Sequence, residues 1–189
     1  MSIIIGITGT MGAGKDTIAD HLVDKWNFIH HSCSDALRDE LVSRGEEEGR
    51  DILRKIGSKL RSKFGTGILG ERIKQKITDG QEPRTVVTSL RHPDEIKALR
   101  EGKNSKFSLV SVDADTRKRF ERLRKRDRKG DSATLKQFKA QEAKEMGTTG
   151  AGQQIGVCMS MADYKISNDD DFEDLYKKID KIIHGLGIK

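Results

Sequence analysis

One stretch near the start of the chain decides the fold, and it reads Gly9-Thr10-Met11-Gly12-Ala13-Gly14-Lys15-Asp16-Thr17. An apolar run over residues 3–8 precedes it, and apolar residues with helical spacing follow it from Ile18. A strand, a glycine-rich loop and a helix in this order are the context in which the G-x-x-x-x-G-K spacing forms a phosphate-binding loop. Glycines permit backbone conformations closed to other residues, so that N–H groups and the positive end of the helix can converge on an anion. The stretch therefore predicts a nucleoside triphosphate site.

The loop also indicates how a triphosphate and its metal ion would be held. The residues expected to bind them are Gly9, Met11, Gly12, Ala13, Gly14, Lys15, Asp16 and Thr17. Lys15 would place its ammonium against the β- and γ-phosphates. The next position is normally Ser or Thr, whose hydroxyl binds Mg²⁺, but here it is Asp16, with Thr17 one residue later. A carboxylate is also a good oxygen ligand for a hard cation, so we expect Asp16 or Thr17 to hold Mg²⁺, directly or through water.

Composition bounds the class of protein. The chain has 189 residues, which suits one domain, and 34% of them are hydrophobic and 35% charged. No run approaches the roughly 18 apolar residues of a membrane span, and no leader-like segment precedes the first strand. The two cysteines, Cys33 and Cys158, form neither a disulfide framework nor a metal-binding spacing. We therefore expect a cytoplasmic protein with reduced thiols and no membrane contact.

Strand-like and helix-like stretches alternate along the chain. Strands are expected over 3–8, 28–33, 84–91, 107–113 and 161–168. Helices are expected after the loop, from an N-cap at Ser34, over two segments within 49–79 and over 117–129. Two more are expected, one from a cap at Thr134 and a last one that buries a stripe from Phe172 to Ile183. This order predicts an α/β P-loop NTPase fold, a parallel sheet of about five strands flanked by helices, in a single domain over residues 1–189.

Positive charge is concentrated in one segment. The chain carries a formal net charge of +6, and residues 117–129 contain nine basic and two acidic residues. Like charges on one helix repel each other, so a polyanion held nearby would relieve the repulsion. A basic helix of this kind is typical either of a lid that closes over a triphosphate or of an RNA-binding surface. Because no aromatic residues interleave with the charges as a stacking platform, the pattern favours the lid.

Several segments resemble known P-loop kinases. The Gly-Lys-Asp-Thr sequence of the loop is similar to that of phage deoxynucleoside monophosphate kinases, and residues 32–38 resemble an adenylate kinase segment. Residues 122–126 have the R-L-x-x-R spacing of the adenylate kinase lid entrance. The Arg-Phe-Glu-Arg-Leu sequence at 119–123 resembles an uncharacterised archaeal family related to adenylate and dephospho-CoA kinases. Residues 162–168 resemble the A-D-x-x-I-x-N segment of that family and of dephospho-CoA kinases.

The resemblance implies roles for individual residues. Arg38 and Arg91 would bind the acceptor phosphate, and Arg122 and Arg126 would stabilise the transferring phosphoryl group, with residues 35–80 as a helical acceptor-binding region and 117–150 as a basic lid. Lys129 to Ser132 would form a short lid tip. The resemblance also implies that Asn168 lies near the adenine ring, whereas its position after a strand would equally suit a turn residue with left-handed backbone.

Two acidic positions leave alternatives open. Asp35 would bind Mg²⁺ through water, orient the acceptor oxygen, or only complement the helix dipole. The related kinases place an Asp at the end of the strand over 84–91, whereas this chain has Thr88 or Ser89 there. A carboxylate for Mg²⁺ must then come from elsewhere, and Asp16 is the compensating candidate.

These observations predict an ATP- and Mg²⁺-dependent phosphotransferase that moves the γ-phosphoryl group to a small phosphorylated acceptor, a nucleoside or deoxynucleoside monophosphate. Dephospho-CoA kinase is the alternative within enzymes, favoured by residues 162–168. An alternative of another class is a slow nucleotide-dependent RNA-binding or assembly factor, favoured by the basic helix and by the missing strand-end acid.

Overall fold

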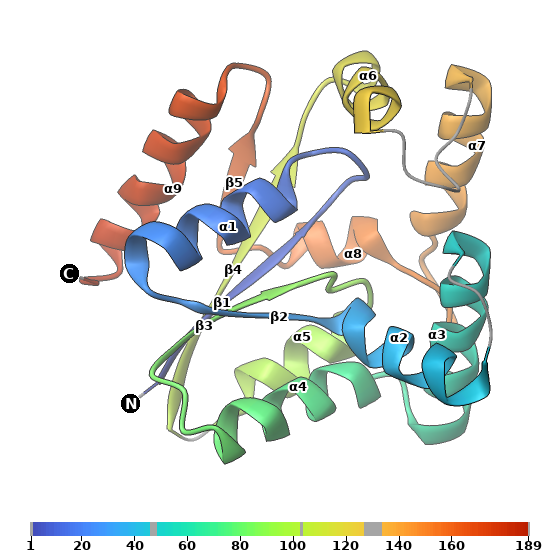
Figure 1. Cartoon of the computed structure of the whole chain (residues 1–189), viewed down its shortest axis with the longest axis horizontal. Coiled ribbons are helices and arrows are strands. Elements are labelled where there is room, and N and C mark those ends of the chain that lie inside the picture. The colour runs from blue at the N-terminus through green and yellow to red at the C-terminus, as the bar shows by residue number, and fades with distance from the viewer. Residues whose placement is uncertain (1, 46–48, 103, 127–133, 189) are drawn as a thin grey trace.

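One parallel sheet organises the molecule. In the computed structural model, which describes all residues except 1, 46–48, 103, 127–133 and 189, the strand order is β2-β3-β1-β4-β5 (Figure 1). The strands are β1 Ser2–Gly9, β2 Ile29–Ser32, β3 Arg84–Thr88, β4 Ser105–Asp113 and β5 Tyr164–Ser167. All four neighbouring pairs are parallel, as expected when helices provide the connections between strands. The predicted α/β fold with five parallel strands is therefore confirmed.

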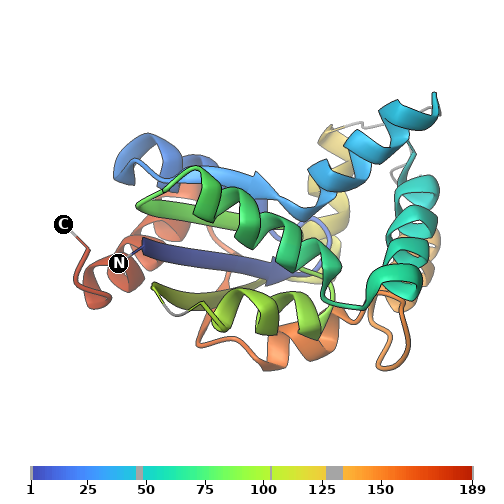
Figure 2. The same cartoon turned by 90° about the horizontal axis from the view of Figure 1, so that it is seen from below.

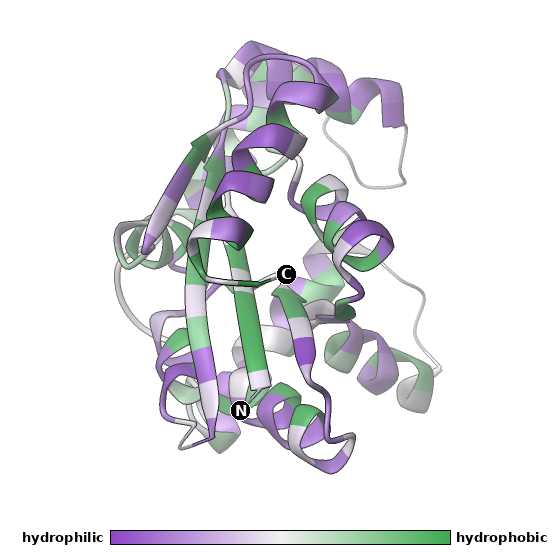
Figure 3. Ribbon diagram, turned by 90° about the vertical axis from the view of Figure 1, so that its left-hand side faces the viewer, coloured by the Kyte–Doolittle hydropathy of each residue, from purple (hydrophilic) through white to green (hydrophobic). Residues whose placement is uncertain are grey.

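Helices cover both faces of this sheet. Their bounds are α1 Lys15–Trp26, α2 Cys33–Arg44, α3 Arg50–Phe64, α4 Ile68–Asp79, α5 Pro93–Arg100, α6 Thr116–Arg126, α7 Leu135–Glu145, α8 Ile155–Ser160 and α9 Phe172–Gly185. Successive strand residues point to opposite faces, so Ile4 packs with α2, α4 and α5, whereas Ile5 packs with α1 and α9. The central strand β1 is coloured hydrophobic along most of its length (Figure 3), as expected for a strand buried on both faces.

A second group of elements lies beyond the carboxyl ends of the strands. The helices α2 and α3 and the helices α6 and α7 project from that end of the sheet (Figures 1 and 2). A small apolar cluster of Met11, Leu123 and Phe138, with Phe120 and Leu135 at its edge, joins the loop after β1 to α6 and α7. Ligands of open α/β sheets bind at this end, so the fold places the loop and both helical groups around one region.

The structure corrects several sequence-based boundaries. The N-cap of α2 is Ser32 rather than Ser34, since the Ser32 hydroxyl oxygen accepts a hydrogen bond from the Ser34 main-chain N–H. The strand β3 ends at Thr88 because Ser89 takes a left-handed conformation with φ of 61°. The short helix α8 was not predicted at all. The expected lid tip at 129–132 lies outside the described residues.

The last helix also differs from its prediction at one residue. Leu175, Ile179 and Ile183 are buried in the core as expected, but Phe172 has 66% of its surface exposed. Phe172 occupies the first turn of α9, next to the loop after β1, where it lines the cleft described below. An exposed aromatic ring at this place is therefore a candidate contact for a ligand rather than a core residue.

Candidate active site

The phosphate-binding loop has the geometry that its sequence predicts. It joins the end of β1 to the start of α1, and Gly12 and Gly14 adopt φ values of 77° and 99°. A Cβ atom at Gly12 would lie 2.7 Å from the Arg119 carbonyl oxygen, and one at Gly14 would lie 2.4 Å from Asn168 Nδ2. Both glycines are thus required by backbone conformation and by close packing.

The side chains of the loop face one large cleft. The cleft encloses about 1120 Å³, and its lining includes Gly9, Met11, Gly12, Gly14, Lys15, Asp16 and Thr17, whereas Ala13 is fully buried. Lys15 Nζ donates hydrogen bonds to the main-chain oxygens of Gly9, at 3.0 Å, and Thr10, at 2.6 Å. These two bonds hold the ammonium against the loop, where it is expected to bind phosphate oxygens.

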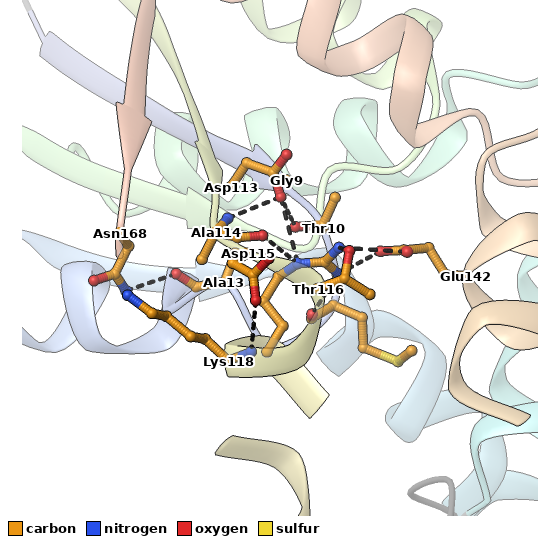
Figure 4. A network of polar contacts seen from close by, with 12 residues as sticks. Gly9, Thr10, Ala13, Asp113, Ala114, Asp115, Thr116, Lys118, Glu142 and Asn168 are labelled. Carbon is orange, nitrogen blue, oxygen red and sulfur yellow. Dashed lines mark hydrogen bonds and ion pairs between the residues drawn. The ribbon is translucent and has the colours of Figure 1, made fainter. Parts of the chain in front are cut away.

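Neighbouring strands support the loop from behind. Thr10 Oγ1 donates to Asp113 Oδ1 at 2.5 Å at the end of β4, and Asn168 Nδ2 donates to the Ala13 carbonyl oxygen at 2.8 Å (Figure 4). Asn168 is buried and has no positive φ, so the alternative of a left-handed turn residue is wrong. Its side-chain amide supports the loop, and a contact with adenine stays a prediction.

Both residues predicted to bind the acceptor phosphate line the same cleft, on the side of β2 and β3. Arg38 of α2 pairs with Asp35, with 2.7 Å between Arg38 Nη1 and Asp35 Oδ1. Arg91 follows β3, donates to Gln153 Oε1 at 3.2 Å, and lies 3.8 Å from a Glu145 carboxylate oxygen. The structure therefore brings Arg38 and Arg91 together around one space, with Asp35 held by its own helix neighbour.

A buried ion pair sets the position of Arg91. Glu95 of α5 accepts hydrogen bonds from the main-chain N–H groups of Arg91 and His92 through Oε2, and from Arg61 through Oε1 at 2.6 Å. Both partners of the Arg61–Glu95 pair are buried. Because His92 also completes a capping box with Glu95, the turn that follows β3 is held at three points.

The edge of the sheet where related kinases carry an acid holds uncharged groups and a histidine. Thr88 Oγ1 lies 2.7 Å from His30 Nε2, and the Ser32 and Ser89 hydroxyls are 3.0 Å apart. Ser89 is strained by its positive φ, a feature that is common at functional sites. Among the described residues no three His, Cys, Asp or Glu side chains form a metal-binding group. Asp16 and Thr17 remain the oxygen donors beside Lys15, and Mg²⁺, which keeps waters and phosphate oxygens as ligands, needs only one or two of them.

The helix α6 contributes an unsatisfied hydrogen-bond donor. Arg122 and Arg126 of α6 line the cleft, and Arg122 Nη1 is buried with no hydrogen-bond partner. Leaving such a donor unpaired costs about 1–3 kcal/mol, and an anionic oxygen in the cleft would satisfy it. Of the observations on α6, this unpaired donor points most directly to an anionic ligand.

Neither cysteine is a candidate nucleophile. Burial raises the pKa of the Cys33 thiol well above its ordinary value, and burial raises the pKa of Cys158 to about 12. Both therefore stay protonated thiols at neutral pH, and a nucleophilic cysteine requires the thiolate.

Sequence reasoning missed a buried arginine next to the loop. Arg119 of α6 donates a hydrogen bond to the Met11 carbonyl oxygen at 3.2 Å and pairs with Glu142 of α7. It belongs to a run of nine basic residues, and nothing in its spacing distinguishes it from its exposed neighbours. Its main counter-ion, the half-buried Glu142, comes 23 residues later, so the sequence gives no local sign of the pair.

The fold and the loop together define a P-loop kinase-like protein. Residues 5–148 match a family model described as an AAA domain. The chain has the fold of the shikimate kinase from Bacteroides thetaiotaomicron, with a TM-score of 0.62 and 14% identity over 96% of this chain and 98% of that one. It is also similar to the shikimate kinase from Acinetobacter baumannii in complex with shikimate, with a TM-score of 0.59 and 15% identity over 100% and 96% of the two chains. At these identities the likeness concerns the fold alone.

Sequence relatives assign the family. The chain is 31% identical to a UPF0200 protein of Thermococcus gammatolerans over 97% of either chain. It is 30% identical to a UPF0200 protein of Methanocaldococcus jannaschii over 97% of this chain and 90% of that one. The chain belongs to the UPF0200 family, which confirms the predicted likeness to an archaeal kinase-like family. No helix in the described part of the chain is long and apolar enough to cross a membrane.

Proposed function

We propose that this protein is a phosphotransferase that moves the γ-phosphoryl group of ATP to a nucleoside monophosphate. The observation that carries the proposal is that one cleft is lined by the phosphate-binding loop and by four arginines from three parts of the chain. These are Arg38 of α2, Arg91 after β3, and Arg122 and Arg126 of α6. Such a transfer requires a loop that binds the triphosphate of the donor and guanidinium groups that bind the phosphate of the acceptor.

The donor would be held at the loop. Main-chain N–H groups and the Lys15 ammonium would bind the β- and γ-phosphates, and Asp16 or Thr17 would hold Mg²⁺, which neutralises charge on the phosphate oxygens when bound. The buried, unpaired Arg122 Nη1 would gain a phosphate oxygen as its partner. The exposed ring of Phe172 lies at the same cleft and offers a stacking face for the base. Positioning and charge neutralisation would supply most of the rate.

The acceptor would lie between β3 and α2. Arg38 and Arg91 line this part of the cleft, and guanidinium groups bind phosphate oxygens in a bidentate manner. A phosphate oxygen is already ionised at neutral pH and needs no general base to remove a proton. A threonine and a histidine occupy the strand-end position in place of an acid, so the carboxylate for Mg²⁺ would come from Asp16.

A second candidate acceptor is a hydroxyl group, as in dephospho-CoA. His30 and Asp35 both line the cleft, and either side chain could accept a hydroxyl proton. The two candidates differ in whether the acceptor reacts through a phosphate or through an alcohol oxygen, so a panel of acceptors separates them.

The proposal is tested by ADP release from ATP and Mg²⁺ with a panel of ribo- and deoxynucleoside monophosphates and dephospho-CoA. We expect one monophosphate to stimulate release strongly and Lys15→Ala to abolish it. Arg91→Lys should raise the KM for the acceptor with little change in the KM for ATP, because Lys lacks the planar fork of Arg. Arg117→Lys, an exposed change in α6, is the matched control.

Two outcomes would contradict the nucleoside monophosphate assignment. Stimulation by dephospho-CoA alone would assign the hydroxyl acceptor instead. Slow release that no acceptor stimulates would refute the phosphotransferase. Steeply salt-dependent RNA binding, lost when exposed arginines of α6 are replaced, would then support the RNA-binding alternative.

A further inference from the structure

Arg119 is buried in the lid helix although arginine is almost always exposed. Its side chain is 4% exposed, and its guanidinium donates to the carbonyl oxygen of Ala114 at 2.7 Å and to Thr116 Oγ1 at 3.2 Å. It also forms a two-point ion pair with Glu142 and lies over the ring of Phe138. A buried charge is stable only with compensation of this kind, so its burial requires a specific set of partners.

One of these bonds reaches the phosphate-binding loop. Arg119 Nη1 donates to the Met11 carbonyl oxygen at 3.2 Å. Met11 is followed by Gly12, and no cis peptide bond occurs in the described part of the chain. In a trans peptide the C=O and N–H groups point in opposite directions, so the Gly12 N–H points away from Arg119. Gly12 itself lines the cleft.

The orientation of this peptide matters because a phosphate needs N–H donors and is repelled by carbonyl oxygens. Gly12 has a φ of 77° and carries no side chain to resist rotation of the peptide. A flip of the Met11–Gly12 peptide would put the Met11 carbonyl oxygen where the Gly12 N–H now lies, and would replace a hydrogen-bond donor by an acceptor. The hydrogen bond from Arg119 opposes that flip, and the close approach of the Arg119 carbonyl oxygen to Gly12 limits the space for it.

The charge of Arg119 is already compensated within the protein. Glu142 pairs with both terminal nitrogens, and Asp113 Oδ1 lies 3.5 Å from Nε. Arg119 does not line the cleft, in contrast to Arg122 and Arg126 one and two turns later. The guanidinium of Arg119 therefore holds the main chain at Met11 and Ala114 rather than a ligand. Side chains of α6 and α7, among them Glu142, hold the guanidinium in turn.

We infer that Arg119 is a positioning residue that fixes the orientation of the Met11–Gly12 peptide, so that triphosphate binding at the loop depends on the α6–α7 pair. The inference rests on the proposed binding of ATP at this loop. It predicts that disturbing Arg119 weakens binding of the phosphate chain itself, independently of the nucleoside.

The test measures the Kd of Mg·ADP and of inorganic tripolyphosphate by calorimetry, well below the unfolding temperature of each variant. Arg119→Lys keeps the charge but cannot make all the bonds of the guanidinium. We expect the Kd of both ligands to rise about tenfold to a hundredfold, because one hydrogen bond from a charged group to the loop is lost. Arg117→Lys, an exposed arginine two residues earlier on α6, should change the Kd by less than about twofold.

A second variant covers the case in which Arg119→Lys fails to fold. Arg119→Met combined with Glu142→Met removes both charges of the pair, and such apolar replacements of buried pairs are often neutral for stability. The Met11 carbonyl still loses its donor, so the same weakening is expected. Unfolding temperatures are recorded in parallel, because a purely structural role would lower them while leaving both Kd values unchanged.

The outcomes separate the inference from the proposed function. Wild-type protein that binds tripolyphosphate and Mg·ADP, with a folded Arg119 variant that binds both equally well, would overturn the inference alone. Wild-type protein that binds neither ligand would refute the nucleotide-binding function and the inference with it. Weakened binding of both ligands in the Arg119 variants but not in the Arg117 variant would support both.

Discussion

A carboxylate on the last helix provides a test of how α1, the helix that follows the phosphate-binding loop, is held in place. Asp180 of α9 is 17% exposed, and it accepts hydrogen bonds from Trp26 Nε1 at 2.7 Å and from Lys25 Nζ at 2.8 Å. His21 Nε2 lies 2.8 Å from the same carboxylate, and its ring stacks on Tyr176. Replacing Asp180 with Asn removes the charge at the centre of this cluster.

The magnitude follows from the pKa of Asp180. Burial alone would raise the pKa of this carboxyl. Hydrogen bonds from Lys25, His21 and Trp26 outweigh burial and lower the pKa to about 2, from an ordinary value of 3.8. A pKa difference of nearly two units corresponds to about 2–3 kcal/mol, since one unit is worth about 1.4 kcal/mol. A carboxyl whose pKa is lowered by folding stabilises the folded state in full when the pH is above the pKa of the same group in the unfolded chain. This stabilisation is lost as the pH falls from about 4 to about 2.

The assay is urea unfolding of wild-type protein and of Asp180→Asn at several pH values. We expect the variant to lose about 2–3 kcal/mol of unfolding free energy at pH 7, and the difference to shrink below about pH 4 as the wild-type carboxylate becomes protonated. Asp24→Asn, an exposed acid on α1, is the control and should cost less than about 0.5 kcal/mol. A difference at pH 7 below about 0.5 kcal/mol, or one that persists undiminished at pH 2, would refute the reasoning.

Three further predictions concern the cleft and its supports. Phe172→Ala should raise the Kd of Mg·ADP about threefold to tenfold and leave that of tripolyphosphate unchanged, because only the nucleotide carries a base to stack; equal effects on both ligands would contradict this. Gly14→Ala should destabilise the fold by about 2–3 kcal/mol and weaken Mg·ADP binding, since the new Cβ would displace the Asn168 amide from the loop at a φ of 99°. Normal calorimetric binding by a fully stable variant would argue against that. Glu95→Gln should cost about 3–5 kcal/mol in urea unfolding, because Arg61 would remain buried without its counter-ion, and a loss below about 1 kcal/mol would disprove it.

The strands and most helices were predictable because their signals are local. The β-branched stretches of β1 and β3 lie within those strands, and the capping residue Thr134 directly precedes α7. The helix α8 was not predicted because it has only six residues, which are too few to show a helical periodicity. The end of β3 was placed too late because the left-handed turn at Ser89 carries no glycine to mark it.

The candidate site was predictable where residues belong to a motif and less so where they meet only in space. The loop over 9–17 and the arginines at 38, 91, 122 and 126 line one cleft, and their roles there stay predictions. Phe172 repeats the spacing of the core stripe on α9, so its sequence position predicted burial. It is exposed because the first turn of that helix lies beside the cleft rather than over the sheet.

The sequence by itself determined the class of fold and the position of the phosphate-binding loop, because both depend on contacts and conformations of residues close together in the chain. The tertiary structure alone decided which of the basic residues of α6 would be buried. Arg119 becomes a support of the loop only because Met11, 108 residues earlier, and Glu142, 23 residues later, are brought to it. A buried charge is stable only among such partners, and partners distant in sequence are defined by the packing of the whole chain.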